Sequence, residues 1–274
     1  VFDEIHWLKL LEYGPFYALL GWGIFRDGYL FRDKSYPPPQ DISVIIPTLN
    51  ESERIGPCLT VLKDRPTVKE IIVADGGSTD NTRQIALEYG ARVVQSQKGR
   101  GFQIKAGLQA ASGDVFLILH ADCIAKKGLF SNVIRTLAAN PHAAGGACGM
   151  EFEKKHAKTR IVAILNNTRT FLTGISFGDQ AQFFRANALE QMGGFPAVML
   201  MEDVELSLRL KQTGRVLYLK EGVLASGRRW EDRKFSKNFI TVVWLFTRYL
   251  VERRLGQGAA GNQKYYATYY GQKR

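Results

Sequence analysis

The chain has 274 residues, of which 45% are hydrophobic and 23% are charged. This composition is typical of a globular protein and excludes a disordered or fibrous chain. The formal net charge is +11, and residues 228–274 carry +8 of it, because 11 Lys and Arg stand there against 3 Asp and Glu. A basic end of this kind attracts polyanions, which include nucleic acid, anionic lipid and phosphorylated substrates.

The three cysteines form no closely spaced pair; they are Cys58, Cys123 and Cys148. This spacing argues against a disulfide framework and a structural zinc site. It favours a reducing compartment, and we expect a cytoplasmic location.

Two apolar stretches lie near the ends of the chain. Leu10–Phe25 is rich in aromatic residues but is flanked or interrupted by charges, and it lacks the features of a signal peptide. Phe239–Val251 contains Arg248 and is too short to span a bilayer, which needs about 20 apolar residues. Each stretch is expected either to pack on the domain as a helix or to lie on the inner face of a membrane.

The chain divides by composition into three segments. Residues 1–40 form an apolar, aromatic extension that ends in a proline-rich linker, since Pro37, Pro38 and Pro39 cannot continue a helix. Residues 41–235 form the main domain. Residues 236–274 form a basic, aromatic tail, which we expect to contact an anionic membrane surface or to pack on the domain.

The main domain begins with alternating strands and helices. The β-branched apolar runs predict strands at 41–47, 70–74, 91–95 and 114–119. Helices are predicted after Asn50 as a cap, after Thr79 or Asp80 as a cap, and at 102–111, with a further helix at 204–213. This order predicts an α/β fold with a doubly wound, mainly parallel sheet and flanking helices.

Polar clusters follow three of the predicted strands. Such sheets bind ligands beyond the carboxyl ends of their strands, so these clusters are expected to form one site. The clusters are Pro47-Thr48-Leu49-Asn50-Glu51, Asp75-Gly76-Gly77-Ser78 and His120-Ala121-Asp122.

Each cluster has a functional and a plain reading. Asp75 before two glycines can accept a hydrogen bond from a base or ribose, or it can form an ordinary turn. Asp122 after the most apolar strand can bind Mg²⁺ or Mn²⁺, or it can be a surface acid. Arg100, in the loop Lys98-Gly-Arg-Gly before a helix, suits a diphosphate or is simply solvated.

Two acids, Glu202 and Asp203, open the predicted helix at 204–213. Acids in a first turn often only complement the helix dipole. In the functional reading, one of them is a general base that takes a proton from an incoming hydroxyl.

These motifs, in this order, resemble glycosyltransferase family 2, whose inverting enzymes have the GT-A fold. The resemblance covers about residues 41–234 and includes Gly193-Gly194-Phe195 and Arg228-Arg229-Trp230, which is similar to the family's distal arginine–tryptophan motif. The segments around Lys98, His120, Gly178-Asp179-Gln180 and Met201 are similar to the arsenosugar-biosynthesis-type subgroup.

The resemblance implies a nucleotide-diphospho-sugar donor, an unidentified acceptor hydroxyl and a divalent metal, Mg²⁺ or Mn²⁺. It implies Asp203 as the catalytic base with Glu202 beside it, and Asp122 as the metal ligand. The implied substrate-binding residues are Pro47, Thr48, Glu51, Asp75, Gly76, Arg100, Asp179, Gln180, Arg229 and Trp230. His120 departs from the family's usual acid, so we assign the metal to Asp122 alone.

Two other functions compete with this reading. A sugar-nucleotide pyrophosphorylase would share the sheet and use Mg²⁺, but it should carry a glycine-rich loop with Arg and Lys where this chain has Pro47–Glu51. A non-enzymatic polyanion- or membrane-binding protein would explain the basic tail but not the three polar clusters. We expect no nucleic-acid partner.

Overall fold

The computed structural model describes residues 35–196, 198, 200–231 and 235–256, and the expectations for residues 1–34 and 257–274 fall outside them. The strands are β1 (Ile42–Thr48), β2 (Val68–Asp75), β3 (Arg92–Gln95), β4 (Val115–Ile118), β5 (Cys123–Ala125), β6 (Ala143–Phe152), β7 (Phe183–Arg185) and β8 (Arg215–Ala225). The helices are α2 (Ser52–Thr60), α3 (Thr82–Glu88), α4 (Arg100–Ala110), α5 (Leu129–Ala139), α6 (Ala157–Thr173), the 3₁₀ turn η1 (Gly178–Gln180), α7 (Ala186–Gln191), α8 (Glu202–Thr213), α9 (Arg228–Glu231) and α10 (Phe235–Arg254).

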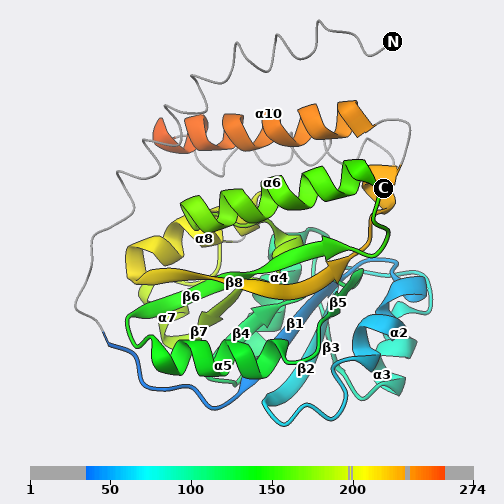
Figure 1. The fold of residues 1–274 in the computed structure, drawn as a ribbon. Helices are drawn as coiled ribbons and strands as arrows, with labels where there is room; N and C mark the ends of the chain where they lie inside the picture. Colours follow the sequence, from blue (N-terminus) through cyan, green and yellow to red (C-terminus); the bar gives the residue numbers. More distant parts are fainter. Residues whose placement is uncertain (1–34, 197, 199, 232–234, 257–274) are drawn as a thin grey trace, which may run out of the picture.

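The eight strands form one sheet in the order β3-β2-β1-β4-β7-β6-β8-β5 (Figure 1). β3, β2, β1 and β4 are parallel, which confirms the predicted doubly wound half. β7 runs antiparallel to both β4 and β6, while β8 pairs in parallel with β6 and antiparallel with β5. The sheet is therefore mixed, and its parallel half consists of the first four strands of the chain, β1 to β4.

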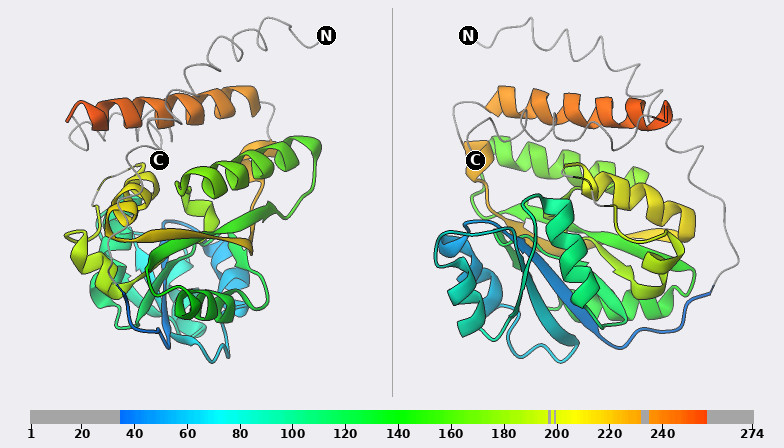
Figure 2. Two further views of the ribbon diagram at one scale, coloured as in Figure 1. Left: turned by 60° about the vertical axis from the view of Figure 1, so that its left-hand side comes forward. Right: turned by 180° about the vertical axis from the view of Figure 1, so that it is seen from behind.

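Apolar side chains from alternate positions of β1 enter two cores. Ile42, Val44 and Ile46 meet α2, α3 and α5 on one face, as the period of two in a strand requires. Ile45 points to the other face, where α4, α7 and α8 cover it. Figure 2 shows helices on both faces of the sheet.

The cap predicted for the first helix is wrong. Asn50 has a left-handed φ of 54° and its side chain accepts a hydrogen bond from Thr79 N at 2.8 Å, so it ties two loops together instead. α2 begins at Ser52, whose N–H donates to Asp80 Oδ2 at 3.1 Å. The other oxygen of Asp80 accepts from Thr82 N at 3.0 Å at the start of α3, so one carboxylate serves both helices.

The linker before β1 is held to the domain. Arg185 donates to the carbonyl of Pro37 at 2.5 Å and to those of Leu137 and Ala143 at 2.7 and 2.8 Å. Tyr36 is buried, and its hydroxyl donates to Thr213 O at 3.1 Å. Residues 36 and 37 thus belong to the folded unit.

The last described helix, α10, packs on α8 and lies above α6 in Figures 1 and 2. The stretch Phe239–Val251, expected either to pack on the domain or to lie on a membrane, contains four aromatic residues. Three of them contact the protein: Tyr249 is buried, Phe246 meets the Phe177 ring edge-on at 5.7 Å, and Phe239 packs on the core. The fourth, Trp244, is exposed. Within the described residues, no helix is long and apolar enough to cross a membrane.

Candidate active site

The loops after β1 and β2 form one wall of the site. Thr48 and Asp75 are register partners at the ends of these strands, and Gly76 N donates to Thr48 O at 2.9 Å. Asp75 is buried, and its Oδ2 accepts from the N–H groups of Gly77 and Ser78 at 3.0 and 2.9 Å. The carboxylate therefore shapes its own loop, while the buried Thr48 hydroxyl has no hydrogen-bond partner within the described part of the chain.

Arg228 of α9 joins two of the predicted clusters. Its Nη2 lies 3.3 Å from Glu51 Oε2 and 3.5 Å from Asp122 Oδ2. Burial alone would lower the pKa of Arg228, but these two carboxylates outweigh it and raise that pKa. Asp122, which follows β4, is 34% exposed, so its carboxylate faces the open side of this cluster.

His120 and η1 are in close contact. A Cβ on Gly178 would lie 2.4 Å from His120 Nε2 and 3.3 Å from Arg100 Nη1, so only glycine fits there without a shift. Burial, and after it the charge of Arg100, lowers the pKa of His120 to about 3. The imidazole is therefore neutral near pH 7.

Arg100 and Glu202 bring α4 and α8 together. Arg100 Nε lies 3.3 Å from Glu202 Oε1, and the Glu202 side chain is 1% exposed. Neither oxygen of Glu202 has a hydrogen-bond partner among the residues described. Burial raises the pKa of Glu202 to about 7, with Arg100 lowering it and Asp203 raising it.

Asp203 is held differently from its neighbour. Its Oδ2 accepts from Gly178 N at 2.7 Å and its Oδ1 accepts from Val204 N at 2.8 Å. Each oxygen keeps a free lone pair, so Asp203 is oriented and still able to accept a proton.

Two residues of η1 have separate roles. Burial raises the pKa of Asp179 to about 6, Arg169 lowers it, and Asp203 and Asp122 raise it, while its buried Oδ1 has no hydrogen-bond partner within the described ranges. Gln180 is completely buried, and its Oε1 accepts from Arg169 Nη2 at 3.0 Å and from Thr170 Oγ1 at 2.7 Å. Gln180 therefore anchors η1 to α6, and Asp179 lies near the carboxylates of Asp203 and Asp122.

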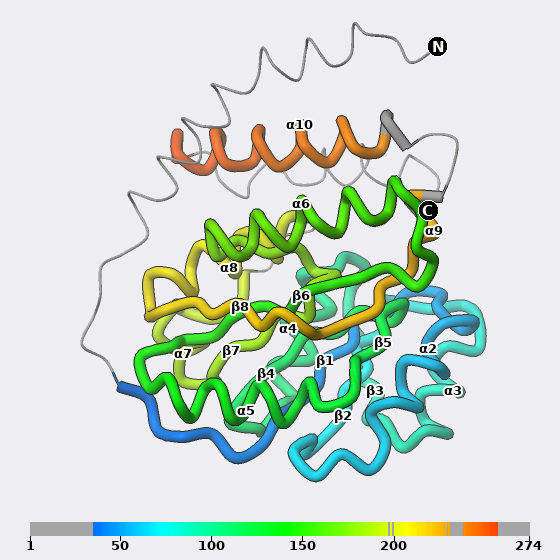
Figure 3. Tube along the Cα trace, viewed as in Figure 1, coloured from blue at the N-terminus to red at the C-terminus, as the bar shows by residue number. Residues whose placement is uncertain are grey.

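The structure brings most of the predicted site residues to one edge of the sheet. Figure 3 traces the chain from β6 into α6. Pro47 is buried in β1, Trp230 is partly buried against the core, and the Arg229 side chain lies outside what the structure describes. Sequence reasoning missed the contact of Arg169 with Gln180, because no motif marks this arginine within α6. It named Arg228 only within a motif.

Residues 43–191, more than half of the chain, match the family model described as glycosyl transferase family 2. The chain belongs to this family. The family expected from the motifs is therefore confirmed, while the arsenosugar-biosynthesis-type subgroup stays a prediction.

Curated relatives match over shorter regions. Glucosyl-3-phosphoglycerate synthase from Petrotoga mobilis is 36% identical over 95 residues, which are 30% of this chain and 29% of that protein. The low-salt glycan biosynthesis hexosyltransferase Agl6 from Haloferax volcanii is 38% identical over 87 residues, 30% of this chain and 21% of that protein. The matched region thus spans less than a third of either relative.

Solved structures share the GT-A fold with this chain. The mannosyltransferase PcManGT from Pyrobaculum calidifontis, in complex with GDP-Man and Mn²⁺, has a TM-score of 0.57 at 19% identity and covers 92% of this chain and 76% of its own. Glucosyl-3-phosphoglycerate synthase from Mycobacterium tuberculosis, in complex with Mn²⁺, UDP and glucosyl-3-phosphoglycerate, has a TM-score of 0.53 at 20% identity and covers 80% of each chain.

Proposed function

We propose that this protein is a metal-dependent, inverting glycosyltransferase that moves a sugar from a nucleotide-diphospho-sugar to an acceptor hydroxyl. The observation that carries the proposal is the convergence of Asp122, Asp179, Glu202 and Asp203 with Arg100 at the carboxyl edge of a GT-A sheet. Membership of the family supports it. Structural neighbours that bind nucleotides with Mn²⁺ support the choice of donor and metal.

In this proposal the nucleoside lies against the β1 and β2 loops. Pro47, Thr48, Glu51 and Gly76 are assigned to this wall, where the Thr48 hydroxyl is buried without a hydrogen-bond partner among the described residues. Asp75 acts by holding its loop in shape, because its carboxylate is already engaged with Gly77 and Ser78. Arg229 and Trp230 would also bind the substrate, as the resemblance to the family's distal motif implies.

The residues present suit a divalent cation of the Mg²⁺ or Mn²⁺ type. No group of three or more metal-binding side chains occurs within the described residues. Such ions are commonly held by one or two carboxylates together with substrate phosphates. Asp122, partly exposed at a strand end, meets that requirement and would hold the ion. When bound, the cation neutralises charge on the departing nucleoside diphosphate.

Asp203 is the proposed general base. It would take the proton from the acceptor hydroxyl as that oxygen bonds to the anomeric carbon, while the bond from that carbon to the diphosphate oxygen breaks on the opposite side. Arg100 would lie against the diphosphate and Asp179 against the sugar. Gln180 would hold η1 in position rather than touch the substrate, because its side-chain amide is fully buried.

The test compares Asp203→Asn with Glu202→Gln for turnover and for donor affinity in the presence of Mn²⁺. We expect Asp203→Asn to lower turnover by about 10²–10⁴ with little loss of donor affinity. Loss of turnover only in Glu202→Gln would reassign the base. Near-normal rates in both variants would overturn the transferase proposal, and release of pyrophosphate instead of nucleoside diphosphate would favour a pyrophosphorylase.

The proposal specifies the acceptor only by its hydroxyl group and the subgroup only by the sequence motifs. It also includes a location for the enzyme. We infer a cytoplasmic enzyme that associates peripherally with the inner face of an anionic membrane. The basic character of residues 228–274 supports this inference.

A further inference from the structure

Helix α6 has a largely polar inner face and an apolar outer face. Val162 and the enclosed polar side chains of Thr159, Asn166 and Thr170 point into the protein. The opposite face carries large apolar side chains at helical spacing, each 48–69% exposed: Ile161, Ile164, Leu165, Phe171 and Leu172. An exposed apolar side chain on its own is ordinary, but a continuous stripe marks an interaction surface.

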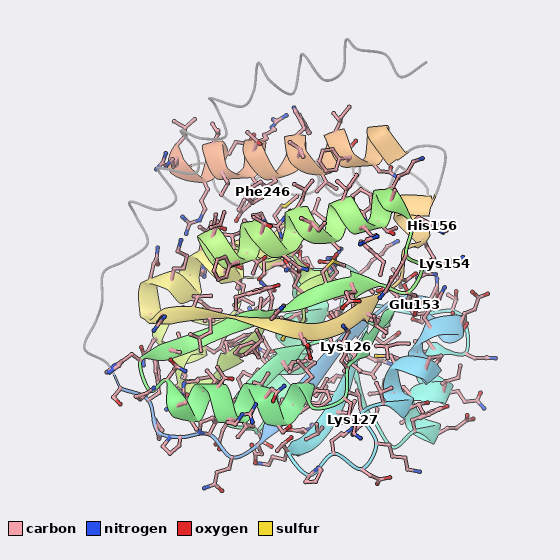
Figure 4. The ribbon with its side chains drawn as sticks, in the orientation of Figure 1. Lys126, Lys127, Glu153, Lys154, His156 and Phe246 are labelled. Carbon is pink, nitrogen blue, oxygen red and sulfur yellow. The ribbon has the colours of Figure 1, made fainter. Side chains whose placement is uncertain are left out.

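Helix α10 repeats this arrangement. Its inner face holds Leu245, Tyr249 and Leu250 against α8, and Phe246 lies on the side that faces α6 (Figure 4). The outer face exposes Ile240 by 52% and Trp244 by 46%, and Val251 and Leu255 continue it.

The exposed apolar side chains are concentrated here. Of the 11 large apolar side chains that are exposed in the described part of the chain, nine lie on α6, on α10 or directly after α10. The other two, Leu87 and Tyr89, lie on α3 or directly after it. Helices α6 and α10 lie on the same side of the sheet in all views, and we name the exposed side chains of these two helices the α6–α10 face (Figures 1 and 2).

Positive charge accompanies this surface. Residues 154–173 contain five Lys and Arg and no acid, and four of these five lie outside the buried pair of Arg169 with Gln180. Residues 235–254 contain four Lys and Arg and one acid, and Arg248 and Arg253 are paired there with Glu252 and Glu205. Residues 35–153, by contrast, contain twelve of each sign. Within the face, the Arg248 guanidinium lies 5.1 Å from the Trp244 ring centre, which places a cation next to an exposed aromatic ring.

We infer that the α6–α10 face docks on an anionic bilayer, with its apolar side chains at the level of the lipid headgroups. Exposed Trp and Leu together with Lys and Arg suit that boundary, where apolar burial and attraction to anionic lipid act together. A second copy of the chain would bring two faces of the same positive sign together, which charge repulsion opposes. This inference rests on the membrane association proposed above and assigns the contact to α6 together with the outer face of α10.

The face is next to the candidate active site along the chain. Four residues separate the end of α6 at Thr173 from Gly178, whose N–H holds Asp203. Docking would therefore place the membrane contact within a few residues of η1 and of the backbone N–H that holds Asp203.

The test is co-sedimentation of the full chain with vesicles of phosphatidylcholine, with and without phosphatidylglycerol, at low and high salt. We expect binding to the anionic vesicles only, and weaker binding at high salt. The double variant Ile164→Ser/Phe171→Ser should weaken binding about tenfold or more, because two exposed apolar side chains are removed. Leu87→Ser is the matched control, since Leu87 and Ile164 are both 61% exposed.

A second variant tests charge separately from apolar contact. Lys158→Glu/Arg160→Glu, on the same helix, should weaken binding at low salt and change it little at high salt. Thermal unfolding of every variant checks the fold, and hydrolysis of the donor in solution should stay at the wild-type rate.

Four outcomes would overturn the inference. The first is absence of vesicle binding, and the second is equal binding to neutral vesicles. The third is vesicle binding that both double variants retain. The fourth is a wild-type protein that binds no vesicles but forms a dimer, which Ile164→Ser/Phe171→Ser converts to a monomer. The third outcome would place the contact outside α6, and the fourth would identify a second copy as the occupant.

Discussion

Burial makes the carboxyl group of Glu202 costly to ionise. Its folded-state pKa is raised to about 7 from an ordinary value of 4.5. The folded state therefore binds this proton more tightly than the unfolded chain does. The stability that results is fully present below about pH 4.5 and is lost as the pH rises through about 7.

The Glu202→Gln variant should become more stable relative to wild type as the pH rises from about 5 to about 8. Glutamine cannot ionise, so the difference in free energy of unfolding should shift in its favour by about 2–3 kcal/mol over this range. Denaturant unfolding at several pH values measures it, with the exposed Glu190→Gln as control. Parallel pH curves for wild type and Glu202→Gln would show that Glu202 is charged in the fold.

Asp122 is the residue on which metal dependence should rest. Asp122→Ala should abolish Mn²⁺-dependent binding of a nucleoside diphosphate while the fold stays intact, because the side chain is partly exposed at a strand end. Titration calorimetry with and without Mn²⁺ measures this. Glu190→Ala, an exposed acid on α7 beyond the other end of the sheet, should bind normally. Undiminished metal-dependent binding by Asp122→Ala would reject the assignment.

At the scale of elements, the turn η1 contacts both His120, which follows β4, and Asp203 in the first turn of α8. Gly178→Ala should push η1 away from His120 and Arg100 and move the N–H that orients Asp203. A displacement of about 1 Å can lower turnover about 10²-fold. Steady-state kinetics should show that loss with a nearly unchanged melting temperature. Gly56→Ala, whose added Cβ would make only ordinary contacts from 3.6 Å, is the control and should keep full turnover.

Helices α8 and α10 are joined through one carboxylate. Glu205 accepts from Tyr249 Oη at 2.7 Å, from Arg253 Nε at 2.6 Å and from Arg209 Nε at 2.8 Å. Burial raises the pKa of Glu205, but these hydrogen bonds outweigh it and hold that pKa below its ordinary value. The stabilisation is therefore present at neutral pH and is lost as the pH falls through the folded-state pKa.

Glu205→Gln should lower the free energy of unfolding by about 1.5–3 kcal/mol at pH 7, since it removes charge-assisted hydrogen bonds. The loss should shrink in acid, where the wild-type carboxylate is protonated as well. Thermal or denaturant unfolding measures both effects. Glu252→Gln removes only the pair with Arg248 on the surface of α10 and should cost little. Equal losses in the two variants would mean that Glu205 does not anchor α10.

At the scale of the whole molecule, the proposed donor site is built from both halves of the sheet. Its loops follow β1, β2 and β4 on one side, and η1, α8 and α9 complete it on the other. A ligand in this site contacts distant parts of the chain at once, so binding should stabilise the domain as a unit.

UDP or GDP with Mn²⁺ should therefore raise the melting temperature. At about 100 times the dissociation constant, the gain is about 2.7 kcal/mol. For a chain of this size, that corresponds to roughly 5–10 °C. Differential scanning fluorimetry measures the shift, and Asp122→Ala should not show it. A shift of equal size with inorganic pyrophosphate alone would point to the pyrophosphorylase instead.

The sequence by itself determined the parallel half of the sheet and the polar loops at its edge. The runs at β1, β2, β3 and β4 are apolar and β-branched, and a strand of this kind is specified by its own residues. The positions of Asp75, Asp122, Glu202 and Asp203 follow from the same local signals, because each ends a strand, lies in the loop after one or opens a helix. The family motifs added roles to these positions.

Only the tertiary structure decided which side chains meet. Arg228 reaches Glu51 across 177 positions of sequence, and Gly178 reaches Asp203 across 25. No local pattern encodes such partners, because they depend on how β6, β7 and β8 pair and on where α6, η1 and α8 then lie. The left-handed turn at Asn50 and the packing of α10 on α8 have the same origin, since contacts from distant segments outweigh local propensity there.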